Sequence, residues 1–212
     1  IESLKQLNEL GYNGNVYIYG WDSSETAINT SKFLLTYEKR IIWKDRLNFE
    51  LKHVQDSLRE QWQNDYDVIL MNPPFVSWEQ LDKESREAVK NVLDINITGR
   101  PNQASAFFYK SILSLNDSGV IDCVIPSSLL LLDAYQKLRH EIMDLISLNL
   151  IGKLGNFVFE DALTDVSLIV GQKPKSNNTP YVLWTKNEKG LAQDVLRDFR
   201  KMHFSENYKV VE

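Results

Sequence analysis

The chain has 212 residues, 43% of them hydrophobic and 25% charged, which is typical of a globular domain large enough to bury a substantial core. Its formal net charge of −5 disfavours a compact DNA-binding module, because such modules usually carry a basic surface. The charge does not exclude an enzyme that holds DNA through another domain.

The periodicity of apolar residues predicts alternating helices and strands along most of the chain. The predicted helices cover residues 1–10, a segment after Ser23 or Ser24, residues 79–93, 104–115 and 126–146, and part of the charged C-terminal residues. The predicted strands cover residues 16–19, 49–54, 66–71, 120–125, 148–154, 166–171 and 181–185. Such alternation predicts an α/β fold built on a mostly parallel sheet. The short connection between 148–154 and 166–171 predicts that this final pair is antiparallel.

The lone cysteine, Cys123, lies in an apolar run and is expected to be a core thiol, which suits a reducing, cytoplasmic location. His53, His140 and His203 are too scattered to suggest a metal site, so no metal is expected. No membrane span is expected either, because no stretch approaches the roughly 20 apolar residues that a spanning helix needs.

The tetrapeptide Asn72-Pro73-Pro74-Phe75 directly follows the apolar run at 66–71. Consecutive prolines cannot donate to a sheet ladder, so they end the strand in a stiff loop at its carboxyl end, where open α/β sheets bind ligands. The Asn72 side-chain oxygen and the Pro73 carbonyl can each accept one N–H of an amino group on a flat ring, and Phe75 can stack on that ring. Both hydrogen bonds bias the nitrogen lone pair out of the ring system, which makes it nucleophilic. A plain strand-ending turn is the alternative interpretation.

These residues resemble the catalytic motif of amino-group methyltransferases that use S-adenosylmethionine, above all the DNA adenine N6-methyltransferases of bacterial restriction-modification systems. The resemblance implies a Rossmann-like methyltransferase fold, S-adenosylmethionine as cofactor, and catalytic roles for Asn72, Pro73, Pro74 and Phe75, with Asn72 also near the cofactor. Protein-glutamine and some ribosomal-RNA guanine methyltransferases carry close variants, so the motif alone does not identify DNA as the substrate.

Two aspartates at strand ends resemble the cofactor-binding residues of the same family. Asp22 ends the segment Tyr19-Gly20-Trp21-Asp22, and the resemblance implies that it binds the cofactor ribose, with Trp21 beside it. Capping of the following helix is the alternative role of Asp22. Asp56 follows the strand predicted at 49–54, and the resemblance implies that it accepts a hydrogen bond from the cofactor's adenine amino group, with Ser57 or Leu58 near the ring. A surface turn is the alternative, and Ser57 stands where the family often has an aromatic residue.

The segment from Ala106 through Pro126 and the residues after Leu154 resemble further blocks of this family. Within the second of these, Phe159 aligns best with a base-stacking aromatic residue and Phe157 is the competitor, with core packing as the alternative for either. An amino group buried in base pairing must be flipped out to be reached, so Phe75 and Phe159 are expected to flank a flipped adenine of double-stranded DNA. Glutamine methyltransferases have no such need.

The resemblance covers about residues 1–173 and includes no glycine-rich loop, which in the family follows the first strand and approaches the methionine part of the cofactor. We therefore expect a catalytic core at 1–175 that lacks its first strand and this loop, and a C-terminal extension at 176–212 that leads toward a recognition region. Besides DNA, the expected partner is a specificity subunit, a restriction subunit or a fused nuclease.

The sequence thus predicts transfer of a methyl group from S-adenosylmethionine to the amino group of adenine in DNA, as part of a restriction-modification system. Two alternatives stay open. One is a protein-glutamine or RNA amino-group methyltransferase, and the other is a non-catalytic DNA-binding or structural remnant of the same fold. The isolated chain is expected to be inactive.

Overall fold

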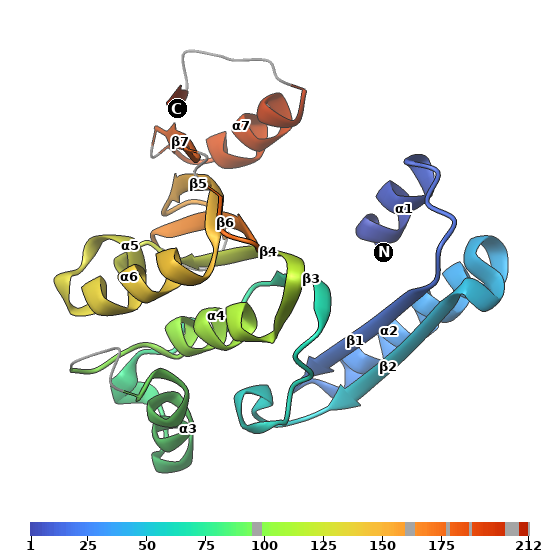
Figure 1. Ribbon diagram of the computed structural model, residues 1–212, viewed down its shortest axis with the longest axis horizontal. Coiled ribbons are helices and arrows are strands. Elements are labelled where there is room, and N and C mark those ends of the chain that lie inside the picture. Colours follow the sequence, from blue (N-terminus) through green and yellow to red (C-terminus); the bar gives the residue numbers. More distant parts are fainter. Residues whose placement is uncertain (95–98, 160–163, 177–178, 187, 202–207, 212) are drawn as a thin grey trace. The chain divides into compact units, whose positions relative to one another are not determined.

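The computed structural model describes residues 1–94, 99–159, 164–176, 179–186, 188–201 and 208–211 (Figure 1). They form two compact units, Ile1–Glu60 and Gln61–Glu212, and each unit contains a sheet of its own. Within the described residues, no helix is both long enough and apolar enough to cross a membrane.

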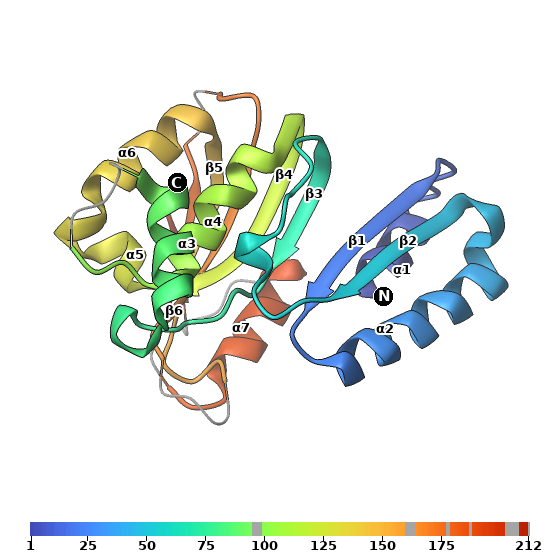
Figure 2. The ribbon, with the colours of Figure 1, turned by 90° about the horizontal axis from the view of Figure 1, so that it is seen from below.

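The first unit is a strand–helix–strand motif preceded by a short helix (Figure 2). Its elements are α1 (Glu2–Glu9), β1 (Val16–Asp22), α2 (Glu25–Glu38), the π-helical turn η1 (Lys39–Trp43), the 3-10 turns η2 (Lys44–Arg46) and η3 (Ser57–Arg59), and β2 (Leu47–His53). The two strands pair in parallel. Ser24 begins α2 as expected, because its side chain accepts a hydrogen bond from Ala27 N at 3.3 Å.

One buried cluster holds the first unit together. It joins Leu4 of α1 and Leu35 of α2 to Trp43 and Leu47. Both helices therefore cover the same face of the two-stranded sheet, as the burial of apolar side chains requires.

The second unit contains a six-stranded sheet with the order β3-β4-β6-β5-β7-β8. Its strands are β3 (Tyr66–Met71), β4 (Leu115–Pro126), β5 (Ser147–Gly155), β6 (Val166–Gln172), β7 (Tyr181–Thr185) and β8 (Tyr208–Val211). The predicted antiparallel pair is confirmed as β5 and β6. The sheet is mixed, since β6 lies between β4 and β5 and runs antiparallel to both, whereas β3–β4 and β5–β7 are parallel.

Helices cover both faces of this sheet (Figures 1 and 2). The helical elements are η4 (Trp78–Gln80), α3 (Lys83–Leu93), α4 (Gln103–Ser114), α5 (Ser128–Leu131), η6 (Asp133–Tyr135), α6 (Gln136–Leu145) and α7 (Leu191–Arg200). On β4 the burial of side chains alternates, and Ile121, Cys123 and Ile125 are buried. The helices α4 and α6 lie over one face of the sheet (Figure 2). On the other face, Val195 of α7 packs with Leu183 of β7.

Cys123 is the core thiol that the sequence predicted. Burial raises the pKa of this thiol well above its ordinary value, and the neighbouring Asp122 raises it further. The thiolate is the nucleophilic form, so burial disfavours reactions at Cys123.

The helix predicted at 126–146 is wrong as a single element. The chain breaks at Leu132, which is extended, with φ −81° and ψ 139°, and so separates α5 from the following helices. Arg139 compensates for the break, because its Nη1 donates to Leu129 O at 3.0 Å and to Leu132 O at 2.7 Å. A side chain from α6 thus donates to two carbonyls on either side of the break.

Candidate active site

The Asn-Pro-Pro-Phe loop begins at the carboxyl end of β3, where the sequence placed it. Pro73 is buried and Phe75 is half-buried, whereas Asn72 and Pro74 are exposed. The buried proline fixes the backbone while the Asn72 amide is accessible to a ligand.

The residues after this loop are fixed to the rest of the second unit. Val76 O accepts a hydrogen bond from Gln103 N at 3.0 Å, at the start of α4. Ser77 then opens η4, and its N–H and hydroxyl donate to Gln80 Oε1 at 3.3 and 3.1 Å. Both contacts reduce the freedom of the loop that carries Asn72 and Phe75.

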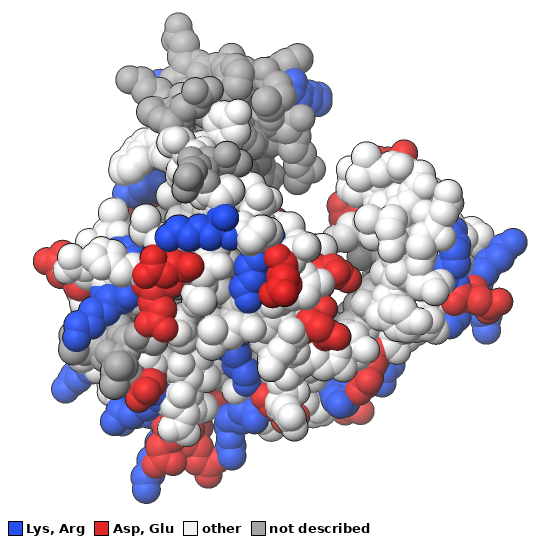
Figure 3. Space-filling view, viewed as in Figure 1, with Lys and Arg blue, Asp and Glu red and all other residues white. Residues whose placement is uncertain are grey.

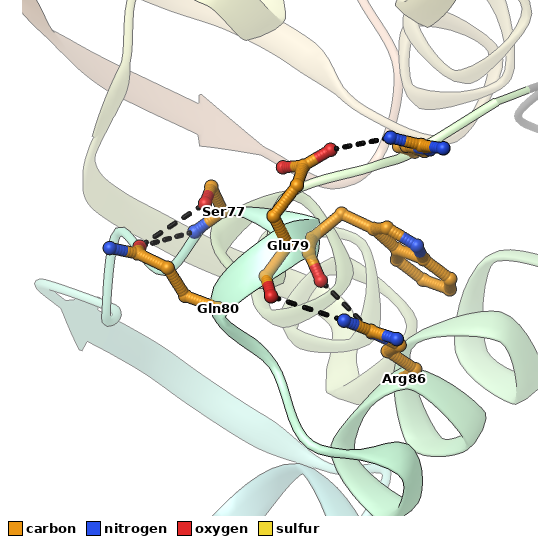
Figure 4. Close-up of polar contacts among 6 residues, drawn as sticks. Ser77, Glu79, Gln80 and Arg86 are labelled. Carbon is orange, nitrogen blue, oxygen red and sulfur yellow. Dashed lines mark hydrogen bonds and ion pairs between the residues drawn. The ribbon is translucent and has the colours of Figure 1, made fainter.

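Arg86 on α3 clamps the turn η4 from the other side (Figure 4). Its Nε donates to Trp78 O at 3.0 Å and its Nη2 donates to Glu79 O at 3.1 Å, while the guanidinium lies 5.6 Å from the Trp78 ring centroid. The Glu79 carboxylate accepts a hydrogen bond from Arg100 at 3.1 Å, and hydrogen bonds from its own backbone N–H and from Arg100 hold the pKa of Glu79 below its usual value. Sequence reasoning did not select Arg86, because an arginine on a polar helix is ordinarily a solvated residue.

We expect Arg86→Ala to destabilise the second unit by about 1–2 kcal/mol, because two backbone carbonyls lose a charged donor. Arg86→Lys should recover little of the loss, since one ammonium cannot reproduce the planar fork that reaches both carbonyls. Urea denaturation measures the effect, with Lys83→Ala at an exposed position of the same helix as control. Equal stability of the lysine variant and the wild type would contradict the clamp.

Phe75 and Phe159 meet in the second unit, although 84 positions separate them in the sequence (159 − 75). Their ring centroids lie 6.2 Å apart and the rings are tilted by 74° to one another, in an edge-to-face contact. The two rings therefore do not present parallel faces to one another. Phe157 is partly buried like Phe159, so burial does not separate the two candidates.

A small apolar cluster supports this aromatic pair. Both rings pack against the buried residues Leu154, Val166 and Leu183 together with Val195. Phe159 therefore packs against the core, as the alternative interpretation expected, and also contacts Phe75.

Asp22 and Asp56 belong to the first unit, where Asp22 is the last residue of β1 and Asp56 follows β2 as the N-cap of η3. The Asp22 carboxylate is exposed, its Oδ1 accepts a hydrogen bond from Ser24 N at 2.7 Å, and its backbone carbonyl accepts one from Val54 N at 3.0 Å. Asp22 therefore stabilises the start of α2, although Ser24 is the capping residue. The Asp22 carboxylate retains further positions that can accept hydrogen bonds. Trp21, beside it, is partly buried.

Asp56 carries the clearest sign of a missing partner. Its Oδ1 accepts a hydrogen bond from Leu58 N at 3.0 Å, whereas its Oδ2 is buried and has no hydrogen-bond partner among the described residues. A buried acceptor without a donor costs about 1–3 kcal/mol, so a ligand that donates a hydrogen bond fits this oxygen. Ser57 is partly buried and Leu58 is buried beside it.

The predicted site residues thus fall into two groups. Trp21, Asp22, Asp56 and Ser57 lie in the first unit, and Asn72, Pro73, Pro74, Phe75 and Phe159 lie in the second. Over the described residues, no three His, Cys, Asp or Glu side chains gather as metal ligands.

The sequence pattern of the Eco57I restriction-modification methylases matches residues 16–159, which is more than half of the chain. The chain belongs to the Eco57I restriction-modification methylase family. The matched range includes both aspartates, the Asn-Pro-Pro-Phe loop and Phe159.

One curated protein is related in sequence, and two solved structures share the fold. A type II methyltransferase, M.AccI of Acinetobacter calcoaceticus, is 29% identical over 120 residues, which make up 55% of this chain and 22% of that protein. A modification subunit assigned to a type I restriction enzyme of Vibrio vulnificus has a similar fold, with a TM-score of 0.64 and 16% identity over 93% of this chain and 43% of that chain. A Listeria monocytogenes protein assigned to the class I S-adenosylmethionine-dependent methyltransferases gives a TM-score of 0.59 with 16% identity, over 93% and 68% of the two chains. The chain thus spans under half the length of the first two, and its fold is the Rossmann-like methyltransferase fold.

Proposed function

We propose that this chain is part of a DNA adenine N6-methyltransferase of a restriction-modification system. The observation that carries the proposal is the loop Asn72–Phe75 at the end of β3, with Phe75 in contact with Phe159, in a chain of the Eco57I family. An amide, a fixed carbonyl and an aromatic pair suit an amino group on a flat ring.

The proposed roles follow from this arrangement. Asn72 Oδ1 and the Pro73 carbonyl accept the two N–H groups of the target amine and so turn its lone pair out of the ring system. Phe75 and Phe159 hold the ring. When bound, S-adenosylmethionine supplies a sulfonium methyl group, which is transferred as a nitrogen–carbon bond forms and the sulfur–carbon bond breaks. The chain contributes position and hydrogen bonds, and the amine releases one proton.

The first unit is the proposed binding site for S-adenosylmethionine. Asp22 has exposed acceptor positions for ribose hydroxyls, and the buried Asp56 Oδ2 suits the adenine amino group as its missing donor. Trp21 and Ser57 lie next to these two aspartates in sequence and are proposed to border the nucleoside.

Double-stranded DNA with a flipped adenine is the proposed substrate, because the amine in a duplex is engaged in base pairing. Lys and Arg side chains are interspersed with Asp and Glu on the face drawn in Figure 3, and the net charge is −5. On this face, mixed charges offer the phosphate backbone little net attraction. We propose that DNA is held by a recognition region toward which residues 176–212 lead, or by a specificity or restriction subunit or a fused nuclease.

We also propose that a further strand completes the first unit. The helices α1 and α2 cover the same face of the sheet, and strand–helix–strand connections are right-handed. If α1 also follows a strand, that strand pairs with the edge of β1 opposite β2, where the described residues provide no partner. A glycine-rich loop between such a strand and α1 would approach the methionine end of the cofactor.

The chain of residues 1–212 alone is therefore expected to bind S-adenosylmethionine weakly and to transfer no methyl group. Asp22 and Asp56 provide only the nucleoside contacts, and these must offset the several kcal/mol that immobilising a ligand costs. Isothermal titration calorimetry measures the binding. A micromolar dissociation constant for the isolated chain would show that its binding site is complete.

The function itself is tested by transfer of a labelled methyl group to DNA, RNA and protein by the full-length protein. The proposal predicts labelled DNA, with N6-methyladenine as the product in mass spectra of its nucleosides. Labelled protein or RNA instead would support the glutamine or RNA methyltransferase. No labelled product, under conditions where the cofactor binds, would support a non-catalytic remnant.

A further inference from the structure

The strongest polar junction outside the residues discussed so far surrounds Asp165, directly before β6. Ser127, which follows β4, donates from its backbone N–H to Asp165 O at 2.9 Å and from its Oγ to Asp165 Oδ1 at 3.0 Å. The hydroxyls of Ser127 and Ser167 lie 2.8 Å apart. Lys153 of β5 places its Nζ 3.5 Å from Asp165 Oδ2. One carboxylate therefore joins the ends of β4, β5 and β6.

This junction is shielded from water on one side. Ser127 and Ser167 are 1% and 0% exposed, so their hydrogen bonds are made in the interior. The Lys153 and Asp165 side chains are 27% and 39% exposed, and Lys153 Nζ also lies 4.8 Å from the Trp184 ring centroid. The buried serine contacts are therefore expected to contribute more than the ion pair, which solvent screens.

Asp165 ends the connection that carries Phe159. Gly155 and Val166 are paired across β5 and β6, so the two ends of this connection meet. Val166, the next residue after Asp165, belongs to the cluster on which Phe159 rests, and so does Leu154, the next residue after Lys153. Asp165 thus ties the support of Phe159 to β4, in addition to the pairing of Val166 with Pro126.

Phe75 reaches the same edge of the sheet from a neighbouring strand. The strands β3 and β4 are parallel, so the residues after them, Phe75 and Ser127, lie at the same edge. A bond from Ser127 to Asp165 therefore ties the Phe159 connection to the side of the sheet from which Phe75 arises. The contact between Phe75 and Phe159 needs both elements to keep their relative position.

We propose that Asp165 is a positioning residue, which holds Phe159 against Phe75 through its hydrogen bonds to Ser127. It touches neither substrate nor cofactor and acts through the aromatic pair. The inference rests on the proposed function as far as the flipped base is concerned, but the placement of Phe159 is a property of the protein alone.

The first experiment therefore needs no DNA. 4-Fluorophenylalanine is placed at position 159 of the full-length protein, and its fluorine resonance is compared between wild type, Asp165→Ala and Asp165→Asn. The alanine variant should move the resonance toward that of the free amino acid. The asparagine variant should leave it in place, because its Oδ1 still accepts from Ser127 Oγ. Thermal melting of the alanine variant checks separately that it folds. An unchanged resonance in the folded alanine variant would overturn the proposal.

The second experiment is a double-mutant cycle read by 2-aminopurine fluorescence at the target position in DNA. Asp165→Ala should lower the equilibrium constant for base flipping about tenfold in the wild-type background. In a Phe159→Leu background, the same substitution should change it less than about twofold, because the ring through which Asp165 acts is absent. A tenfold loss in both backgrounds would show a purely structural role and refute the proposal. If the wild type modifies no DNA, the proposed function fails, whereas the fluorine resonance still decides the role of Asp165.

Discussion

Replacement of Asn72 by alanine is expected to lower the turnover of methyl transfer by about 100-fold or more while leaving the fold intact. Loss of one preorganised polar contact to the reacting group has this scale. Asn72 is exposed at the end of β3, so truncating its side chain removes no core packing. The Pro73 carbonyl would then be the only acceptor left for the amine, and the lone pair would stay conjugated with the ring.

The matched control for this prediction is Asn64→Ala, at an exposed position before β3 in the same unit. It should retain the activity of the wild type. Thermal melting of both variants separates chemistry from folding, and calorimetry shows whether the cofactor still binds. Near-normal methylation by the Asn72 variant, in the full-length protein, would refute the mechanism.

Local signals were sufficient for the elements that carry the site. The apolar run followed by two prolines gives the boundaries of β3 as Tyr66–Met71, and the motif that follows lies at the carboxyl end of that strand. Asp22 and Asp56 were also placed by such signals, since Asp22 ends one strand-like run and Asp56 comes shortly after the next. The end of a strand can be predicted from a few neighbouring residues, so residues at strand ends can be located from short segments of sequence.

Contacts between residues far apart in the sequence could not be predicted from such local signals. Asn116 to Gly119 have the composition of a turn, yet they belong to β4, as an irregularity between the pairs Tyr66–Leu115 and Val68–Val120. Gly119 is needed there for a different reason: a Cβ at this position would lie 2.8 Å from Tyr66 O. The glycine permits a close approach between two strands, and composition does not distinguish that from a turn.

The same limit applies to the site. Family resemblance led us to expect Phe75 and Phe159 on the two sides of a flipped base, but it indicated neither their direct contact nor the orientation of the rings. The support of both loops comes from Arg86 and Asp165, whose partners lie on other elements. Nothing in the residues around them marks either side chain, because their roles are defined by carbonyls and hydroxyls that only the fold brings close.

Phe159, rather than Phe157, is expected to stack on the flipped base. Phe159→Ala should cost about 1–3 kcal/mol in binding the unstacked base, the range found for loss of one aromatic contact. Its contact with Phe75 favours this assignment. Phe157→Ala should instead lower the melting temperature and leave flipping unchanged. The measurement is 2-aminopurine fluorescence at the target position, after sequencing of the methylated DNA has identified that position.

Phe159 also rests on the cluster formed by Leu154, Val166, Leu183 and Val195, so its truncation to alanine lowers stability as well. Phe159→Leu separates the two effects, because leucine keeps most of the apolar volume and removes the ring. If stacking is the role of Phe159, the leucine variant melts close to the wild type and flips the base as poorly as the alanine variant. If packing is its role, the leucine variant recovers both the melting temperature and base flipping. Loss of flipping in Phe157→Ala would then assign the stacking role to Phe157.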